Sequence, residues 1–383
     1  MIKNIIYLVS EDWYFLSHRL VLAQNALDRG YKVHVICKNT GMLNKIEKHG
    51  FKCYELQSFR NNISLINLIK DILNIRAIIK NINPSIVHLV ALRPILLGLS
   101  SLIFLKNIKI ISSVTGMGSI FLSKNLKIKF LKYFILFFLY LNFKRKNINI
   151  IVQNKDDHNF FLNKLNINKN NIFLIRGSGV NIDYFKYVKE PSKAPIIVTF
   201  VGRLIKDKGI ETLFKAFKQV NSVDQNINLL IVGGIDTSNL SAISKDYMNK
   251  KLDENKYVTW LGNVSNIKEI WEKTHIAILP SRREGLPKSL LEAAASGKPI
   301  IATDVPGCRE IAINKYNAIT VPLDNANELA KAILYLGNNQ EVRIKYGLKS
   351  RELVKQGMSE ESVVNKTISI YENLYESLIN NLR

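Results

Sequence analysis

The chain has 383 residues, which is enough for two or three domains that each bury a core of their own. Hydrophobic residues make up 47% of it and the mean hydropathy is +0.02, which indicates a globular protein and excludes a disordered chain or a conventional transmembrane bundle. The formal net charge of +23 points to an anionic partner.

The positive charge is concentrated in the N-terminal half. Residues 1–190 hold 28 Lys+Arg and 10 Asp+Glu, residues 191–383 hold 26 and 21, and residues 101–150 hold nine basic residues and no acidic one. An AT-rich genome would explain abundant lysine but not this asymmetry, so we expect a functional attraction to an anionic partner. Nucleic-acid binding is one alternative, because aromatic residues interleave with the basic ones.

The cysteines and the amino terminus indicate a cytoplasmic protein. Cys37, Cys53 and Cys308 are widely spaced, which fits reduced thiols and argues against a structural zinc site. An apolar segment begins at Ile2, so we expect no cleaved signal peptide.

Apolar strands and helical segments alternate along the first half, as a doubly wound sheet requires. The first helix is predicted over Leu16–Leu27, ending near Gly30. The predicted strands are Ile5–Val9, Lys32–Cys37, Phe51–Leu56, Ile86–Val90, Ile108–Val114 and Ile148–Gln153.

The alternation repeats after a Gly- and Pro-containing connection at 177–195. Helical patterns run from about Asn325 to the end. The predicted strands of this half are Ile196–Val201, Leu229–Val232, Tyr257–Trp260, Ile276–Leu279, Ile300–Ala302 and Ala318–Val321.

One segment of the second half combines a strand, a loop and a helix around two glutamates. Glu284 lies in the loop after Ile276–Leu279, and Glu292 lies in a helix that opens at Pro287 and ends before Gly297. Free backbone N–H groups and the positive end of the helix dipole favour an anionic ligand at this edge of the sheet.

The two carboxylates are repelled by phosphate but accept strong hydrogen bonds from sugar hydroxyls. A nucleoside diphosphate sugar, with a ribose and a hexose on either side of two phosphates, matches this layout. The alternative is that Glu284 is a solvated loop residue and that Glu292 pairs with Lys288 on a helix surface.

Four ordered motifs resemble the family 4 retaining glycosyltransferases. The string from Pro280 to Ala293 is similar to the family's glutamate signature, and Val201–Leu204 with Lys208 and Gly209 resembles its diphosphate-binding strand and loop. Trp260–Val264 resembles the segment along the nucleobase, and Thr303–Ile311 resembles the stretch after the glutamate helix.

The resemblance implies an α/β fold of the GT-B type, in which two Rossmann-like domains face each other across a cleft. It places an acceptor-binding domain at 1–180 and a nucleotide-sugar-binding domain at 195–365. The last helix, 366–383, is expected to cross back to the N-terminal domain.

The resemblance also implies residue roles. Arg203 and Lys208 would neutralise the leaving diphosphate, Glu284 would hold the donor hexose, and Glu292 would hold the ribose. No Asp-x-Asp motif occurs in the sequence, so we expect these cations and the helix amino terminus to replace a metal ion, with no cofactor beyond the nucleotide-sugar co-substrate. The other predicted donor-binding residues are Gly262, Asn263, Val264, Gly285, Leu286 and Pro287.

The acceptor side is predicted less completely. Thr115, Gly116 and Gly118 fall at the cleft in this family, where many relatives have a histidine that this chain lacks. His18, at the start of the first helix, is a candidate to face the same cleft.

The predicted reaction is retaining, metal-independent transfer of a hexose or N-acetylhexosamine, with a UDP-sugar favoured as donor. The acceptor is expected to be a lipid-linked glycan or oligosaccharide in O-antigen, lipopolysaccharide or capsule assembly. The alternatives are another GT-B-type enzyme, such as a sugar-nucleotide epimerase, and a catalytically silent sugar-nucleotide-binding partner.

An apolar segment in the basic region supports a place at the membrane. Phe130–Phe143 is bordered by lysines and would span roughly 21 Å as a helix, short of the ~30 Å hydrocarbon core. It either packs on the N-terminal sheet or lies in the membrane interface. We expect residues 124–146 to bind the anionic inner face of the cytoplasmic membrane peripherally, and we expect no nucleic-acid partner.

Overall fold

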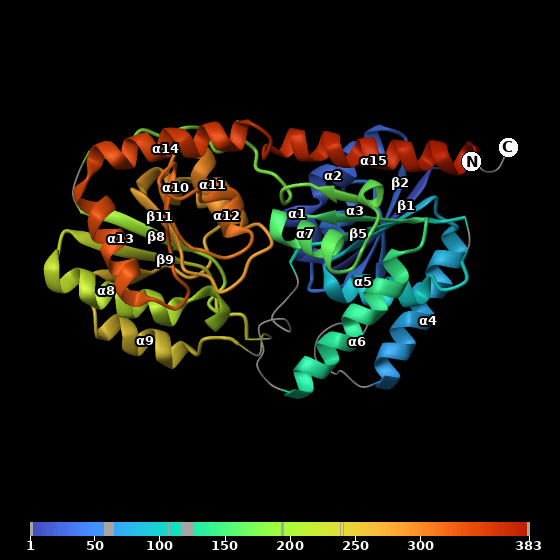
Figure 1. The fold of residues 1–383 in the computed structure, drawn as a ribbon, viewed down its shortest axis with the longest axis horizontal. Helices are drawn as coiled ribbons and strands as arrows, with labels where there is room; N and C mark the ends of the chain where they lie inside the picture. Colours follow the sequence, from blue (N-terminus) through green and yellow to red (C-terminus); the bar gives the residue numbers. More distant parts are fainter. Residues whose placement is uncertain are drawn as a thin grey trace. The chain divides into compact units, whose positions relative to one another are not determined.

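The computed structural model describes residues 3–56, 65–105, 107–116, 126–192, 195–237, 239 and 241–380. The chain divides into two compact units. Unit 1 comprises Met1–Ser178 and Ser362–Arg383, and unit 2 comprises Gly179–Glu361. Each unit contains one parallel sheet with helices packed on it, which is the Rossmann-like pair of the predicted GT-B class (Figure 1).

The sheet of unit 1 has the order β3-β2-β1-β4-β5-β6-β7, with parallel pairing throughout the order. The strands at its centre, such as β1 and β4, read as continuous apolar runs because both faces are covered. The strands are β1 (Asn4–Glu11), β2 (Lys32–Lys38), β3 (Lys52–Glu55), β4 (Ile86–Val90), β5 (Lys109–Val114), β6 (Ile148–Val152) and β7 (Ile172–Leu174).

Successive residues of β1 point into two different cores, one on each face of this sheet. Ile6 and Leu8 pack with α4 to α7, whereas Ile5, Tyr7 and Val9 pack with α1 to α3 and α15. The helices are α1 (Asp12–His18), α2 (Leu20–Asp28), α3 (Leu43–Glu47), α4 (Leu65–Ile82), α5 (Leu92–Ser101), α6 (Leu126–Phe143), α7 (Lys155–Asn163) and α15 (Glu360–Asn380).

The predicted strands of unit 1 agree with the structure to within a few residues, but two details were wrong. The single helix predicted over Leu16–Leu27 is two helices, because Arg19 (φ −129°, ψ −11°) leaves the helical conformation between α1 and α2. The edge strand β7 was also missed, since three residues are too short for a period to appear.

Unit 2 has the sheet order β10-β9-β8-β11-β12-β13, also parallel. All of these strands were predicted from the sequence, with small differences at their ends. They are β8 (Ile196–Val201), β9 (Ile227–Val232), β10 (Val258–Trp260), β11 (Ile276–Leu279), β12 (Ile300–Thr303) and β13 (Ala318–Val321).

Two helices of unit 2, α8 and α13, each bury an apolar stripe in its core. Leu213, Phe217 and Val220 of α8 recur at helical spacing in the core, as do Leu329 and Ile333 of α13. The helices are α8 (Ile210–Val223), α9 (Lys245–Asp253), α10 (Ile267–Lys273), α11 (Lys288–Ala295), α12 (Cys308–Ile311), α13 (Ala326–Asn338) and α14 (Gln340–Lys355).

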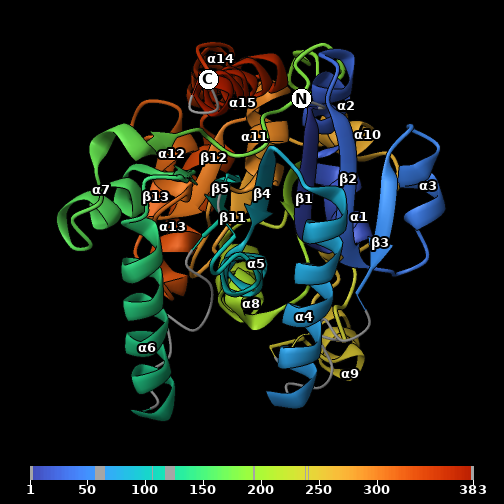
Figure 2. The ribbon, with the colours of Figure 1, turned by 90° about the vertical axis from the view of Figure 1, so that its right-hand side faces the viewer.

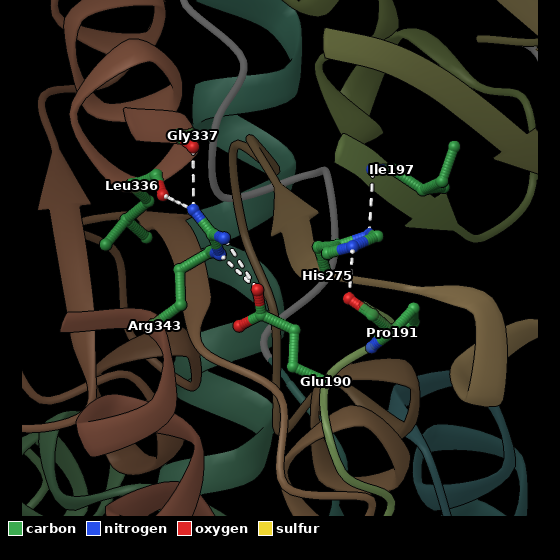
Figure 3. Close-up of polar contacts among 7 residues, drawn as sticks. All are labelled: Glu190, Pro191, Ile197, His275, Leu336, Gly337 and Arg343. Carbon is green, nitrogen blue, oxygen red and sulfur yellow. Dashed lines mark hydrogen bonds and ion pairs between the residues drawn. The ribbon is translucent and has the colours of Figure 1, made fainter. Parts of the chain in front are cut away.

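The segment predicted as an interdomain connection is anchored within unit 2 (Figure 3). Glu190 forms an ion pair with Arg343, whose Nη2 lies 2.6 Å from the Glu190 Oε1, and both side chains are almost fully buried. His275 accepts the Ile197 N–H at Nδ1 (3.0 Å) and contacts the Pro191 carbonyl through Nε2 (3.2 Å). The connecting segment therefore belongs to unit 2, which begins at Gly179.

The C-terminal helix α15 packs in unit 1, although it follows unit 2 in the chain. Tyr371 hydrogen-bonds Tyr7 of β1 (3.1 Å) and His88 of β4 (2.6 Å), and the second nitrogen of His88 bonds Ser113 of β5 (2.6 Å). Burial, together with the nearby charge of Arg19, holds the pKa of His88 well below its usual value, so the imidazole is neutral. His88 is a core residue.

Helix α6 has two different apolar faces. Ile135, Leu139 and Phe143 are buried against the sheet, whereas Phe134 and Phe137 are 64% and 60% exposed. The prediction that this segment packs on the sheet of unit 1 is confirmed for one face of α6, and the other face is exposed. Among the described helices none has the length and apolarity needed to cross a bilayer.

Candidate functional site

The candidate site of unit 2 lies at the point where its strand order reverses. From β8 the chain proceeds to β9 on one side, and β11 pairs with β8 on the other. In open parallel sheets, ligands bind outside the carboxyl ends of the strands at such a reversal. Arg203 and Lys208 follow β8, and Glu284 follows β11, so the structure brings these predicted residues to one edge.

Three loops at this edge touch through their backbones. The Gly233 N–H donates to the Gly262 carbonyl (2.7 Å), and the Trp260 indole donates to the Gly233 carbonyl (2.9 Å). Gly233 has φ +138°, and a Cβ there would lie 1.9 Å from the Gly202 oxygen. Only glycine fits this approach, which holds the loops after β8, β9 and β10 together.

Lys208 and Glu284 form an ion pair at the centre of the site. The Lys208 Nζ lies 2.5 Å from the Glu284 Oε1, and the two side chains are 19% and 11% exposed. The ion pair joins the residue predicted to bind the diphosphate, Lys208, to the residue predicted to bind the hexose, Glu284. Because the lysine neutralises the carboxylate, the pair presents less negative charge to an incoming diphosphate than Glu284 alone would.

The backbone enforces this pairing. Gly209 has φ +75°, and a Cβ on it would lie 1.9 Å from the Pro280 carbonyl oxygen. The Asp207 carbonyl accepts from the Arg282 N–H (2.8 Å) and from the Ser281 hydroxyl (3.1 Å). The loops after β8 and β11 are thus tied together directly beside Lys208 and Glu284.

Arg203 is held by a residue that the sequence analysis did not single out. Its Nη1 lies 2.7 Å from the Oδ2 of Asp236, in the loop after β9. The Arg203 side chain is 43% exposed and that of Asp236 is 15% exposed. No motif pointed to Asp236, because its role depends only on β9 lying next to β8.

Glu292 is buried, with 8% of its surface exposed. The alternative that it is one half of a solvated surface pair with Lys288 is therefore wrong. Burial raises the pKa of Glu292 to about 6, and the charge of Lys288 opposes this shift. An ionised carboxylate kept at such a cost in stability is typical of a binding residue.

The loop between Glu284 and α11 is shaped by a third close glycine contact. Pro287 caps α11 with extended backbone (φ −74°, ψ 116°) rather than forming its first residue, and Gly285 and Leu286 precede it. Gly307 has φ +80°, and a Cβ on it would lie 2.4 Å from the Gly285 oxygen and 2.6 Å from the Glu284 oxygen. The backbone at Gly307, after β12, therefore packs against the loop that carries Glu284 and Gly285.

The predicted base-binding segment follows β10. Gly262 adopts φ +67° with open space around its Cα, and the Asn263 side chain lies against Gly234, where a Cβ would approach its Nδ2 to 2.6 Å. Val264 continues this loop, and Leu261 is 46% exposed. The segment thus reaches the same edge as Arg203 through the Gly233–Gly262 contact.

The acceptor-side candidates lie in unit 1. The His18 ring stacks on Tyr14 with 4.4 Å between centroids, and its Nδ1 lies 2.6 Å from the Ser17 hydroxyl. Thr115 and Gly116 directly follow β5 and are half-buried. Gly118 lies outside the described residues.

Arg19, next to His18, was missed by the sequence analysis although it is 5% exposed. Its Nη1 donates to the His18 carbonyl (3.3 Å), and its charge acts on Tyr7 and His88. The only signal for the burial of Arg19 is its position between α1 and α2, where the backbone leaves the helical conformation. In the part of the chain that the structure describes, no cluster of three or more His, Cys, Asp or Glu could hold a metal ion.

Both halves of the chain match family models of glycosyl transferases. A family model described as "Glycosyl transferases group 1" matches residues 182–353, and one described as "Glycosyl transferase 4-like" matches residues 4–154. The chain is 25% identical over 388 residues to the N,N'-diacetylbacillosaminyl-diphospho-undecaprenol alpha-1,3-N-acetylgalactosaminyltransferase of Campylobacter jejuni, covering 96% of this chain and 99% of that protein.

Two further similarities bear on family and fold. The capsular polysaccharide biosynthesis glycosyltransferase CapM of Staphylococcus aureus is 29% identical over 175 residues, covering 46% of this chain and 45% of CapM. The Anabaena protein HepE, crystallised in complex with UDP, superposes with a TM-score of 0.76 at 14% identity over 97% of this chain and 100% of that one. The likeness to HepE bears on the fold alone. The two family models together match most of the sequence, and they show that the chain belongs to the group 1 and 4-like glycosyl transferases.

Proposed function

We propose that the chain transfers a hexose or N-acetylhexosamine from a UDP-sugar to a lipid-linked glycan in the assembly of a bacterial surface polysaccharide such as O-antigen or capsule. The observation that carries this proposal is the Lys208–Glu284 pair at the β8/β11 reversal, with the buried Glu292 on the helix that follows. The lipid-linked acceptor is suggested by the name of the Campylobacter relative, and UDP by the HepE complex.

In the proposed reaction the bond between the anomeric carbon and the β-phosphate oxygen breaks. The diphosphate leaves with added negative charge, which Arg203, Lys208 and the amino terminus of α11 would stabilise without a metal ion. The acceptor hydroxyl attacks from the same face, which retains the anomeric configuration, and its proton passes to the departing phosphate. Glu284 would orient the hexose and Glu292 the ribose.

Donor binding is the first test. UDP, GDP and their sugars are added to the purified chain, and the unfolding midpoint is measured for wild type and for Glu292→Ala. A ligand at ~100 times its dissociation constant stabilises by ~2.7 kcal/mol. We expect stabilisation by UDP and its sugars that is weaker in the variant, and no stabilisation by any nucleotide would refute the proposal.

Product analysis then separates the reactions. With an acceptor present, NMR should show a new glycosidic bond that keeps the donor's anomeric configuration, and a chelator should leave the rate unchanged. Conversion of the free UDP-sugar without an acceptor would instead identify an epimerase. Nucleotide binding with neither reaction would identify a silent binding partner.

We further propose that the enzyme attaches peripherally to the inner face of the cytoplasmic membrane through residues 124–146. The exposed aromatic face of α6 and the nine basic residues of 101–150 support this assignment. Acceptor binding would then belong to unit 1, with His18, Thr115 and Gly116 as candidates.

A further inference from the structure

Helix α4, like α6, carries an exposed apolar face, which the sequence analysis did not notice. Ile66, Ile69 and Leu73 are 67%, 56% and 60% exposed. Their spacing places them on one side of the helix, while Ile75 and Ile79 are buried on the other. Three large aliphatic side chains in water along one helix need a reason, because isolated exposed residues are common but aligned ones are not.

Helix α6 has the same two-faced pattern. Phe130, Phe134, Phe137 and Leu141 are 79%, 64%, 60% and 54% exposed, and their spacing puts them on one side of the helix, with Tyr133 nearby at 61%. Figure 2 shows the amino-terminal ends of α4 and α6 extending in the same direction beyond the strands of unit 1, on either side of α5. In α4 the three exposed apolar residues lie in the amino-terminal half, and in α6 they run along the helix from Phe130 to Leu141.

The charges around the two faces select the occupant. Lys70 of α4 and Lys129 of α6 are exposed beside the apolar residues, and Lys144 and Lys146 are exposed just beyond α6. The only acidic residue of α4 is Asp71, which is buried, and α6 has none. Such a surface attracts an anionic partner and repels a second copy of itself, which would bring the lysines together.

We infer that α4 and α6 form one docking surface for an anionic lipid bilayer, with the apolar side chains entering the interface and the lysines contacting the headgroups. Two projecting helices would hold unit 1 at two points, whereas α6 alone would leave it free to rotate about one contact. The inference rests on the proposed membrane attachment and extends it to α4. Interfacial helices bury their apolar faces ~5–10 Å deep in the membrane interface. Isoleucine, leucine and phenylalanine side chains are long enough to reach this depth.

Flotation of the full chain with vesicles tests the inference. The vesicles are phosphatidylcholine alone or mixed with phosphatidylglycerol, and the variants are Ile66→Gln/Ile69→Gln in α4 and Phe134→Gln/Phe137→Gln in α6. Val223→Gln/Leu348→Gln in unit 2 is the matched control, since these residues are 73% and 51% exposed. We expect wild type and control to bind the anionic vesicles, and each helix variant to bind about tenfold more weakly.

Each other outcome counts against the surface. Binding of the α4 variant at the wild-type level would exclude α4 and leave attachment through α6. A wild-type dimer that both helix variants dissociate, without vesicle binding, would assign the surface to a second copy. UDP-induced stabilisation is measured on every variant, so that loss of vesicle binding with intact nucleotide binding is distinguished from failure of the proposed transferase.

Discussion

At the residue scale, the site residues differ mainly in how deeply they are buried. The Arg203 side chain is 43% exposed, those of Lys208 and Glu284 are 19% and 11% exposed, and Glu292 is buried. Because a buried charge changes the free energy of unfolding more than an exposed one, Glu292 is the site residue best suited to a stability measurement. Burial raises the pKa of the Glu292 carboxyl to about 6.

Replacing Glu292 with glutamine should stabilise the ligand-free protein. The pKa of this carboxyl is raised from 4.5 to about 6 in the fold, so its destabilising effect is absent below pH 4.5 and complete above pH 6. We expect Glu292→Gln to unfold less readily at pH 7.5 by up to about 2 kcal/mol, with a smaller gain near pH 4.5. Denaturant titrations at both pH values measure this, with exposed Glu341→Gln as control.

The same variant should bind UDP more weakly, because an amide is a poorer acceptor for ribose hydroxyls than a carboxylate. Higher stability combined with weaker binding is the signature of a residue kept for function. Tighter UDP binding in Glu292→Gln would show that the carboxylate does not contact the nucleotide.

Lys298 is a second buried ionisable residue of unit 2. It is 2% exposed, its Nζ has no hydrogen-bond partner among the described residues, and burial lowers its pKa to about 8 despite the nearby carboxylates of Glu190 and Glu272. The buried charge therefore destabilises the fold fully below pH 8 and ceases to do so above pH 10.5.

We expect Lys298→Met to raise the free energy of unfolding at pH 7 by on the order of 3 kcal/mol. The gain should shrink as the pH rises from 8 toward 10.5, where wild-type Lys298 is neutral in both states. Denaturant unfolding at pH 7 and pH 10 checks this, and Lys215→Met on the surface of α8 should change little. An equal gain at both pH values would mean that packing, not charge, is responsible.

At the scale of elements, the site depends on loops that follow different strands and meet at one edge. The Gly209–Pro280 contact joins the loops after β8 and β11, and the Gly307–Gly285 contact supports the second loop from β12. Both contacts require a glycine with positive φ. The spacing between Lys208 and Glu284 is therefore controlled by backbone packing.

Gly209→Ala should separate these loops. Its Cβ would lie 1.9 Å from the Pro280 oxygen, so the chain beside Lys208 must move. Gly30→Ala is the matched control, because Gly30 also has positive φ (+81°) but has no atom within 4 Å of an added Cβ. We expect both variants to lose about 1–2 kcal/mol from the positive φ. Only Gly209→Ala should also lose affinity for the UDP-sugar, measured by calorimetry, and equal affinities would refute the coupling.

At the scale of the whole molecule, each unit has its own core, and α15 returns the chain to unit 1. The side chains of Val364, Ile368 and Tyr371 enter the core beneath β1 and β4. Unit 1 thus depends on residues that follow unit 2 in the chain, whereas the residues proposed to bind the nucleotide all lie in unit 2.

Tyr371→Ala should destabilise unit 1 without affecting nucleotide binding. It removes a fully buried ring and leaves Tyr7 and His88 without their shared partner. We expect a loss of about 3–5 kcal/mol. Hydrogen exchange should show faster exchange in β1 and β4 but unchanged protection of the β8 and β11 loops by UDP. Loss of that protection would show that the nucleotide site needs an intact unit 1.

The sequence by itself determined the parallel strands and the family, because buried strands read as apolar runs and the glutamate motif is local to one strand, loop and helix. It also placed Arg203, Lys208, Glu284 and Glu292 together at the level of motif. Only the tertiary structure decided that Lys208 pairs with Glu284, that Asp236 holds Arg203, and that α4, like α6, leaves one apolar face exposed. These relations join residues that are distant in the chain, so no local pattern encodes them.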